Sequence, residues 1–302
     1  MSFDDLSKQL ASVVAITVTP FGADGAIDEK DYAAVVDRMV EAGISVVTPN
    51  GNTSEFYTLS SAETERALRI TVDVAADRAA IVAGVGHDLT SAVAAARFAD
   101  RAGARGIMIH QPVHPYVSLD GWVDYHRAIA SAVPELSVVL YVRNPRIGGE
   151  QIAALADACP NVVGVKYAVP DPVRFASVAR DAGLERLTWV AGLAELSAPG
   201  YFAVGATGFT SGLANVAPQL SLQMFRCLRA REFGAAMEFW EFVRGFEELR
   251  AAGESANNVS VVKEALAQLG LCRRDVRPPA SVLPEADRSA VGVLLHSWSL
   301  LS

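Results

Sequence analysis

Short runs of apolar, often β-branched residues alternate eight times with longer, alanine-rich amphipathic segments. In the longer segments, such as residues 30–42, 62–75, 90–102 and 172–182, apolar residues recur every three or four positions, which is typical of helices with one buried face. The short runs are mostly apolar throughout, which predicts parallel strands buried on both faces. They are residues 13–18, 44–48, 80–85, 106–110, 137–142, 162–166, 187–191 and 206–210. Eight such strand–helix units predict an α/β fold, the (β/α)8 TIM barrel.

Glycines mark the ends of three predicted helices, and the tail of the chain carries no strand pattern. Gly43, Gly103 and Gly183 each follow an alanine at a helix end, where glycine most easily takes a left-handed C-cap conformation. Residues 215–302 continue as helical segments, interrupted by Arg-Pro-Pro at 277–279. We therefore predict a barrel core in residues 1–214. The eighth barrel helix and a C-terminal helical extension follow in residues 215–302, within the same structural unit.

The totals of the chain fit one such unit and exclude several classes of protein. A length of 302 residues lies within the range of a single barrel with extensions. A net charge of −8 argues against a nucleic-acid-binding face, because such a face is basic. No apolar run approaches the roughly 18 residues of a membrane span, and residues 1–6 lack the features of a secretory signal. Three cysteines without a CxxC pair predict reduced thiols, and hence a cytoplasmic protein.

Lys166 stands out because it ends an apolar predicted strand. The chain holds four lysines against twenty-two arginines, so arginine supplies most of the positive charge. A lysine amine that is withdrawn from water loses its proton more readily and becomes a nucleophile toward carbonyl carbon. The alternative is a side chain whose stem packs on the barrel while its amine reaches water. Position alone leaves both interpretations open.

Other candidates lie where predicted strands end, because barrel enzymes carry their chemistry at the carboxyl ends of the strands. Asn52, Thr53 and Ser54 follow the second strand in a turn whose amides and hydroxyls suit a carboxylate; a plain polar turn is the alternative. Tyr141 lies in the fifth strand, where it is placed to exchange a proton near Lys166. The alternative is a barrel tyrosine whose hydroxyl is already satisfied.

Loops after the fourth and fifth strands add further candidates. Arg146 offers a planar guanidinium that suits a second substrate anion, unless it is a solvated loop residue. His110 and His114 are four residues apart, but Pro112 and Pro115 exclude the helix that would align them as metal ligands. With no third ligand nearby in the sequence, we expect no metal site.

Taken in order, several short stretches resemble the dihydrodipicolinate synthase and N-acetylneuraminate lyase family of class I aldolases. The resemblance covers nearly the whole chain, and the order and spacing of the pieces make it specific. The stretches are TVTPF (17–21), GNTSE (51–55), LY (140–141), GVK (164–166), GATGF (205–209), VKEAL (262–266) and VRPP (276–279). The resemblance implies a Schiff-base mechanism on a small α-keto acid, with no metal or organic cofactor. It also implies a homo-oligomer, either a tetramer or a dimer.

The resemblance further implies roles for five residues. Lys166 matches the imine-forming lysine, and Tyr141 matches the tyrosine that moves protons. Thr53, with neighbouring backbone amides, matches the residue that holds the α-keto carboxylate. Thr207 matches a position whose backbone lines the keto-acid pocket. Arg146 stands where the synthases bind the carboxylate of their second substrate.

Three residues depart from the synthase pattern. Asn52 replaces a threonine and His114 replaces a tyrosine, and in the synthases both of those residues belong to the proton relay. Ser54 replaces the usual glycine before the glutamate. Because histidine titrates near neutral pH, we expect His114 to assist or replace Tyr141 in proton transfer. The EFYTL of residues 55–59 is closer to the sugar-acid branch, which includes 5-dehydro-4-deoxyglucarate dehydratase.

Three hypotheses about function follow. The first is a Schiff-base-forming lyase that carries out aldol cleavage, condensation or dehydration of a 2-keto-3-deoxy sugar acid or related keto acid. The second is a dihydrodipicolinate synthase that condenses pyruvate with aspartate semialdehyde. The third is a keto-acid-binding protein without turnover.

Overall fold

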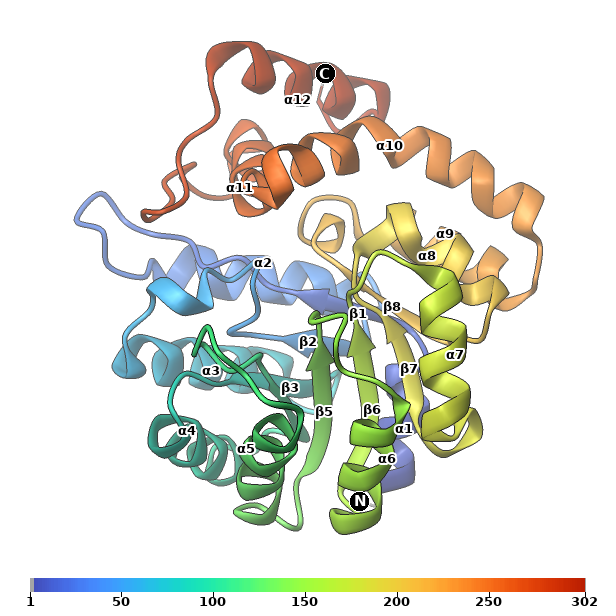
Figure 1. Cartoon of the computed structure of the whole chain (residues 1–302). Coiled ribbons are helices and arrows are strands. Elements are labelled where there is room, and N and C mark those ends of the chain that lie inside the picture. Colours follow the sequence, from blue (N-terminus) through green and yellow to red (C-terminus); the bar gives the residue numbers. More distant parts are fainter. Residues whose placement is uncertain (1–2, 302) are drawn as a thin grey trace.

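The computed structural model describes residues 3–301, and at its centre is a closed barrel of eight parallel strands (Figure 1). Each strand pairs with the next along the chain, and β1 closes the ring with β8. The predicted TIM barrel is confirmed. The strands are β1 (Val13–Ile16), β2 (Val46–Thr48), β3 (Ala80–Val85), β4 (Gly106–Ile109), β5 (Ser137–Val142), β6 (Val162–Tyr167), β7 (Thr188–Ala191) and β8 (Gly208–Ser211).

Helices surround the barrel, and their ends follow local sequence signals. Asp28 caps α2 by accepting a hydrogen bond from the amide of Asp31, and Ser60 with Glu63 forms a capping box at α3. Gly43 (φ 101°), Gly103 and Gly183 (both φ 89°) take left-handed conformations at helix ends, as predicted. The helices between the strands are α2 (Glu29–Glu41), α3 (Ser61–Ala75), α4 (Leu89–Arg101), α5 (Leu119–Ser131), α6 (Gly149–Ala158), α7 (Pro172–Ala182) and α8 (Ala194–Ala203).

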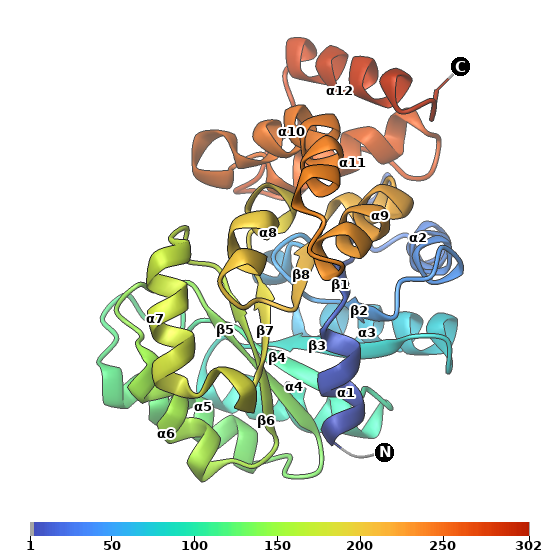
Figure 2. The ribbon, with the colours of Figure 1, turned by 90° about the vertical axis from the view of Figure 1, so that its right-hand side faces the viewer.

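An additional helix, α1 (Phe3–Leu10), closes the amino end of the barrel and was not predicted (Figure 2). Its buried residues Leu6 and Leu10 belong to the apolar cluster inside the barrel. Leu10 lies close enough to β8 that a Cβ on Gly208 would come within 2.3 Å of the Leu10 carbonyl oxygen. The amino end is therefore filled, which leaves the carboxyl end for a site.

The C-terminal helices lie above the carboxyl ends of the strands (Figures 1 and 2). The chain continues after β8 through α9 (Pro218–Arg229) to α10 (Phe233–Ser255), α11 (Asn258–Gln268) and α12 (Glu285–Ser297). Helix α10 is kinked near its end, where Ala252, Gly253 and Glu254 leave helical geometry. This arrangement brings side chains of α10 and α11 over the mouth of the barrel.

Residues 3–301 contain neither a membrane-spanning helix nor a cluster of metal-ligating side chains. No helix in that range is both long and apolar enough to cross a membrane. No group of three or more His, Cys, Asp or Glu side chains in the same range could hold a metal ion. The three cysteines are free: Cys159 is buried, and Cys227 and Cys272 are partly buried.

Candidate active site

A cavity of about 510 Å³ opens at the carboxyl end of the barrel. It lies between the strand ends, the turn that follows β2, and the C-terminal helices. The lining includes residues from all three of these regions: Asn52, Thr53, Tyr141, Arg143, Lys166, Thr210, Glu247, Arg250, Glu254 and Asn258. Two of the lining residues, Lys166 and Tyr141, are the residues on which the expected chemistry depends.

Lys166 lies on β6, directly beside Tyr141 of β5 in the strand register. Its side chain is only 5% exposed, and Nζ lies 4.7 Å from the centroid of the Tyr141 ring. Burial, together with the charges of Arg143 and Arg250, lowers the pKa of Lys166 to about 8. About a tenth of the amine is then neutral at pH 7, against roughly one part in a few thousand for an ordinary lysine. The structure thus supports a withdrawn amine and not one that reaches bulk water.

Tyr141 is buried and keeps its proton at neutral pH. Burial raises the pKa of its phenol, and the positive charge of Arg143 opposes the rise. The side-chain amide of Asn52 donates a hydrogen bond of 3.1 Å to the phenol oxygen. Because the oxygen accepts from Asn52, the phenol proton is free to point elsewhere. The expected closeness of Lys166, Tyr141 and Asn52 is therefore found.

The turn after β2 presents Asn52 and Thr53 to the cavity, whereas Ser54 points away from it. The Ser54 hydroxyl donates to the carbonyl of Thr17 at 2.6 Å, and its amide donates to Gly51. Ser54 is completely buried and does not line the cavity. The expected contact of the Ser54 side chain and amide with substrate is therefore wrong in this structure, because both groups already bond within the protein.

Two other expected residues lie outside the cavity. The ring of His114 is exposed, and its Nδ1 contacts the backbone of Tyr116. Arg146 is also exposed, and its Nη1 donates to the carbonyl of Val117 at 3.2 Å. Neither residue lines the cavity. The expectation that His114 works beside Tyr141 is not met within this chain, because the loop after β4 carries the ring outward.

Thr207 lies at the opposite end of the barrel from the cavity, so its expected place in the keto-acid pocket is wrong. It precedes β8, which begins at Gly208, and its exposed side chain lies near the amino end of the strand. The predicted strand began two residues too early. Thr210, three residues further along β8, lines the cavity instead.

Sequence reasoning missed Arg143, which lines the cavity near Tyr141. Arg143 directly follows β5, two positions after Tyr141, and an extended chain turns side chains two positions apart to the same side. This spacing of two residues could have identified Arg143 from the sequence. Arg143 is exposed and adds a positive charge to the wall near Lys166.

A buried polar wall from α10 and α11 was also missed. Arg250 donates through Nη1 to both carboxylate oxygens of Glu247, at 2.7 and 2.8 Å, and through Nη2 to the side chain of Asn258 at 2.6 Å. Asn258 in turn approaches the hydroxyl of Thr53 at 3.4 Å. These residues come from the predicted helical tail, and helix periodicity alone does not say which helix lies over the barrel mouth.

His110 is a packing residue beneath this region. It is completely buried, and its Nε2 contacts the carbonyl of Asn50 at 2.8 Å while its ring stacks on Phe56. Burial lowers the pKa of His110 to about 3, so the ring is neutral. Gly84 makes room for this contact, because a Cβ there would come within 2.0 Å of the Asn50 carbonyl oxygen and 2.9 Å of His110 Nε2.

Several known proteins are similar to this chain in sequence and in fold. A protein of Saccharopolyspora erythraea named "Probable 5-dehydro-4-deoxyglucarate dehydratase" is 31% identical over 97% of this chain and 96% of its own length. A 4-hydroxy-tetrahydrodipicolinate synthase of Hyphomonas neptunium is 34% identical over 91% of this chain and 93% of its own length. The crystal structure of dihydrodipicolinate synthase from Bacillus clausii superimposes with a TM-score of 0.94 at 40% identity. It covers 97% of this chain and 99% of that one. The family model described as "Dihydrodipicolinate synthetase family" matches residues 9–297, and the chain belongs to that family.

Proposed function

We propose that this chain is a lyase that forms a Schiff base between Lys166 and the C2 carbonyl of an α-keto acid. The observation that carries the proposal is the amine of Lys166, a residue that is only 5% exposed, with its lowered pKa and its position against Tyr141. The neutral amine attacks the carbonyl carbon, and the addition product takes up one proton and loses one water to give a protonated imine. The imine nitrogen then accepts the electrons of a bond that breaks at C3.

The remaining cavity residues suit the rest of the reaction. The hydroxyl of Thr53 and its backbone amide would hold the substrate carboxylate at the turn after β2. Tyr141 keeps its proton at neutral pH. It would donate this proton to a departing hydroxyl group and take up a proton again at the end of the cycle. Departure of a C4 hydroxyl as water after loss of a C3 proton is dehydration. Breaking the C3–C4 bond is aldol cleavage.

A 2-keto-3-deoxy sugar acid is the substrate class that we propose. The far part of the cavity is polar, with Arg143, Glu254 and Asn258 available to hydroxyl or carboxylate groups. Asn52 donates to Tyr141 where a synthase would have a threonine. A relative named as a 5-dehydro-4-deoxyglucarate dehydratase matches the chain along nearly its whole length. These observations favour a substrate with a polar tail.

Condensation of pyruvate with aspartate semialdehyde is the second candidate. It is supported by the 34% identical synthase and by the 40% identical synthase structure. Against it stands the position of Arg146, which lies outside the cavity and donates to Val117. A keto-acid-binding protein without turnover is the third candidate, and it would not need a phenol beside the amine.

The test is reductive trapping. The protein is incubated with pyruvate and reduced with borohydride, and the added mass is located by peptide mapping. We expect the label on Lys166 and on none of Lys8, Lys30 and Lys263. A protein that carries no label anywhere would refute the imine mechanism and leave only a non-covalent role.

Substrate assays then separate the first two candidates. We expect turnover of 2-keto-3-deoxy sugar acids in preference to condensation of pyruvate with aspartate semialdehyde, and the reverse order would support the synthase. The homo-oligomer, tetramer or dimer, and the cytoplasmic location stay predictions. Size-exclusion chromatography with light scattering tests the first of these.

A further inference from the structure

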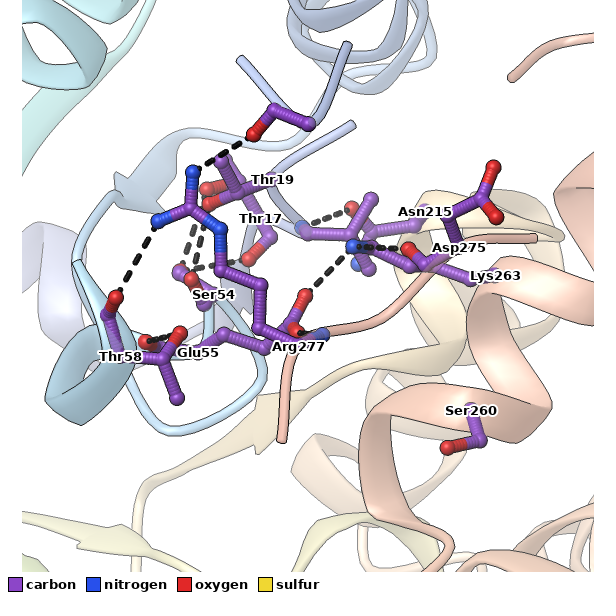
Figure 3. A network of polar contacts seen from close by, with 12 residues as sticks. Thr17, Thr19, Ser54, Glu55, Thr58, Asn215, Ser260, Lys263, Asp275 and Arg277 are labelled. Atoms are coloured by element: carbon purple, nitrogen blue, oxygen red, sulfur yellow. Dashed lines mark hydrogen bonds and ion pairs between the residues drawn. The ribbon is translucent and has the colours of Figure 1, made fainter. Parts of the chain in front are cut away.

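Four of the stretches that carry the family resemblance meet at one buried polar cluster behind the turn after β2 (Figure 3). They are residues 17–21, residues 51–55, residues 262–266 of α11 through Lys263, and residues 276–279 through Arg277; Asp275, next to the last stretch, also takes part. Asn52 and Thr53 of the turn line the cavity, whereas Ser54 and Glu55 do not. The cluster therefore contacts the turn but does not line the cavity in which the reaction is proposed.

Glu55 is the centre of the cluster. Its side chain is 3% exposed, and its backbone holds a left-handed conformation with φ 59°. One carboxylate oxygen accepts a hydrogen bond from Lys263 Nζ at 2.5 Å, and the other accepts from the backbone amide of Arg277 at 2.7 Å. A residue other than glycine keeps this backbone conformation only where its surroundings hold it. The two donors hold its side chain, and backbone hydrogen bonds with Asn52 and Thr58 hold its main chain.

The donors themselves are tied to the rest of the protein. Lys263, which is completely buried, also donates to the carbonyl of Asp275 at 2.8 Å, and its amine lies 4.0 Å from the centroid of the Phe21 ring. The guanidinium of Arg277 lies 4.3 Å from the same ring and pairs with Glu63. The segment at 275–277 is thus held against the β1 loop and α3 at once.

The other side of the turn is held by the loop after β1. Ser54 donates from its hydroxyl to the carbonyl of Thr17 at 2.6 Å, and its own carbonyl accepts from the hydroxyl of Thr19 at 2.8 Å. Fixed at Ser54 and at Glu55, the turn presents Thr53 to the cavity. Ser54 and Glu55 are the two residues that follow Thr53, so their contacts set the path of the chain on that side of it.

We propose that Glu55 is a positioning residue: held by Lys263 and by the backbone of Arg277, it fixes the direction in which Thr53 meets the substrate carboxylate. The inference rests on the proposed role of Thr53 in binding that carboxylate. Through Glu55, the segment between α11 and α12 sets the affinity of the site for keto acids. The cluster does not touch the reacting atoms, so it acts on binding and leaves the bond-breaking step alone.

The experiment compares Glu55→Gln with Glu264→Gln. Glu264 is the next residue to Lys263 on α11, is 1% exposed, and pairs with Arg274 and Arg288 away from the turn. Both substitutions remove one buried carboxylate charge from an ion pair. Pyruvate affinity is measured by calorimetry, which reports carboxylate binding with or without an imine, and borohydride labelling of Lys166 is measured in parallel.

We expect Glu55→Gln to weaken pyruvate binding about tenfold, while the labelling rate at saturating pyruvate stays within about threefold. Glu264→Gln should lower the melting temperature and leave the affinity within about twofold. Equal loss of affinity in the two variants would overturn the proposal, because lower stability of the protein would then explain the weaker pyruvate binding. Unchanged affinity in Glu55→Gln would overturn it as well.

A second variant covers the case in which Glu55→Gln does not fold. Glu55→Asp keeps the charge and suits a left-handed backbone, but shortens the reach to Lys263 and Arg277. We expect Glu55→Asp to weaken pyruvate binding at least threefold. Its labelling rate at saturating pyruvate should stay close to that of the unmodified protein. Unchanged affinity would overturn the proposal.

Loss of the Lys166 label in the unmodified protein with pyruvate affinity intact would refute the proposed function alone. An unmodified protein that binds no pyruvate overturns both.

Discussion

Lys166 and Lys263 are the two buried lysines of this molecule, 5% and 0% exposed, and each amine lies over an aromatic ring. Their partners differ. Lys263 donates to the carboxylate of Glu55 and to a backbone carbonyl, whereas the charges that act most on Lys166 are those of two arginines. Burial lowers the pKa of both lysines, but at Lys263 the charge of Glu55 opposes the change.

Burial alone therefore does not make a lysine a nucleophile. A carboxylate partner keeps a buried amine protonated and turns it into a structural link, while cationic neighbours release the proton. Lys263 therefore holds the turn after β2 in place, whereas Lys166, which lines the cavity, is suited to attack a carbonyl. Substitutions at the two lysines should separate chemistry from stability.

The largest effect is expected from Lys166→Ala. Without the amine there is no nucleophile for the keto acid, so borohydride trapping with pyruvate should fall below detection and turnover should be lost. The far-ultraviolet circular dichroism spectrum and cooperative unfolding should be preserved, because no partner of Lys166 is left unpaired. A variant that keeps a labelled lysine and full turnover would contradict the assigned role.

Lys263→Met should chiefly cost stability. Removing one partner of a buried ion pair leaves the Glu55 charge uncompensated, at a cost of about 3–5 kcal/mol in the free energy of unfolding. Urea denaturation followed by fluorescence measures it. The double variant Glu55→Gln with Lys263→Met is the control, and it should recover much of the loss because no charge remains buried alone. A single variant as stable as the unmodified protein would show that the pair contributes nothing.

The barrel was predictable from sequence because its signals are local and repeated. Apolar runs and glycine C-caps recur along the chain, and they place all eight strands. Lys166, Tyr141 and Asn52 were predicted to lie together because parallel strands end at one rim. The eighth strand begins at Gly208, two residues later than predicted, and Thr207, which the family resemblance placed in the pocket, precedes it, whereas Thr210 lines the cavity.

The wall of α10 and α11 was not predictable in the same way. Glu247, Arg250 and Asn258 contact the barrel mouth only because the tail folds back over it. A helical pattern fixes which side of a helix is apolar, but not what that side covers. The exposed positions of His114 and Arg146 likewise depend on loop paths that periodicity does not describe.

Lys166→Met should stabilise the protein at neutral pH, in contrast to Lys263→Met. A pKa that falls from 10.5 to about 8 on folding costs about 3 kcal/mol while the amine is protonated in both states. The gain in the free energy of unfolding should therefore be full below pH 8. It should shrink as the pH rises and vanish near pH 10.5, where the unfolded lysine also loses its proton. Urea denaturation at several pH values checks this, and a gain that does not change with pH would argue against a lowered pKa.

Tyr141→Phe should slow turnover about a hundredfold, because it removes the group that donates and recovers the proton. Pyruvate affinity should change by less than about threefold, since the ring that faces Lys166 remains. Tyr167→Phe is the matched control: Tyr167 is also buried and next to Lys166, but points to the other face of the strand. Steady-state kinetics should leave that control within about twofold of the unmodified protein. Equal losses in the two variants would point to packing.

The smallest effect is expected from Asn52→Ala. The substitution removes one hydrogen bond to the phenol oxygen of Tyr141, which at about 1 kcal/mol corresponds to roughly fivefold slower turnover. If Asn52 acts through Tyr141, its loss should matter much less in the Tyr141→Phe background, where the hydroxyl is already absent. Kinetics of both single variants and the double variant measure this coupling. Full additivity would mean that Asn52 contacts the substrate independently, and the proton-donating unit would then be Tyr141 alone.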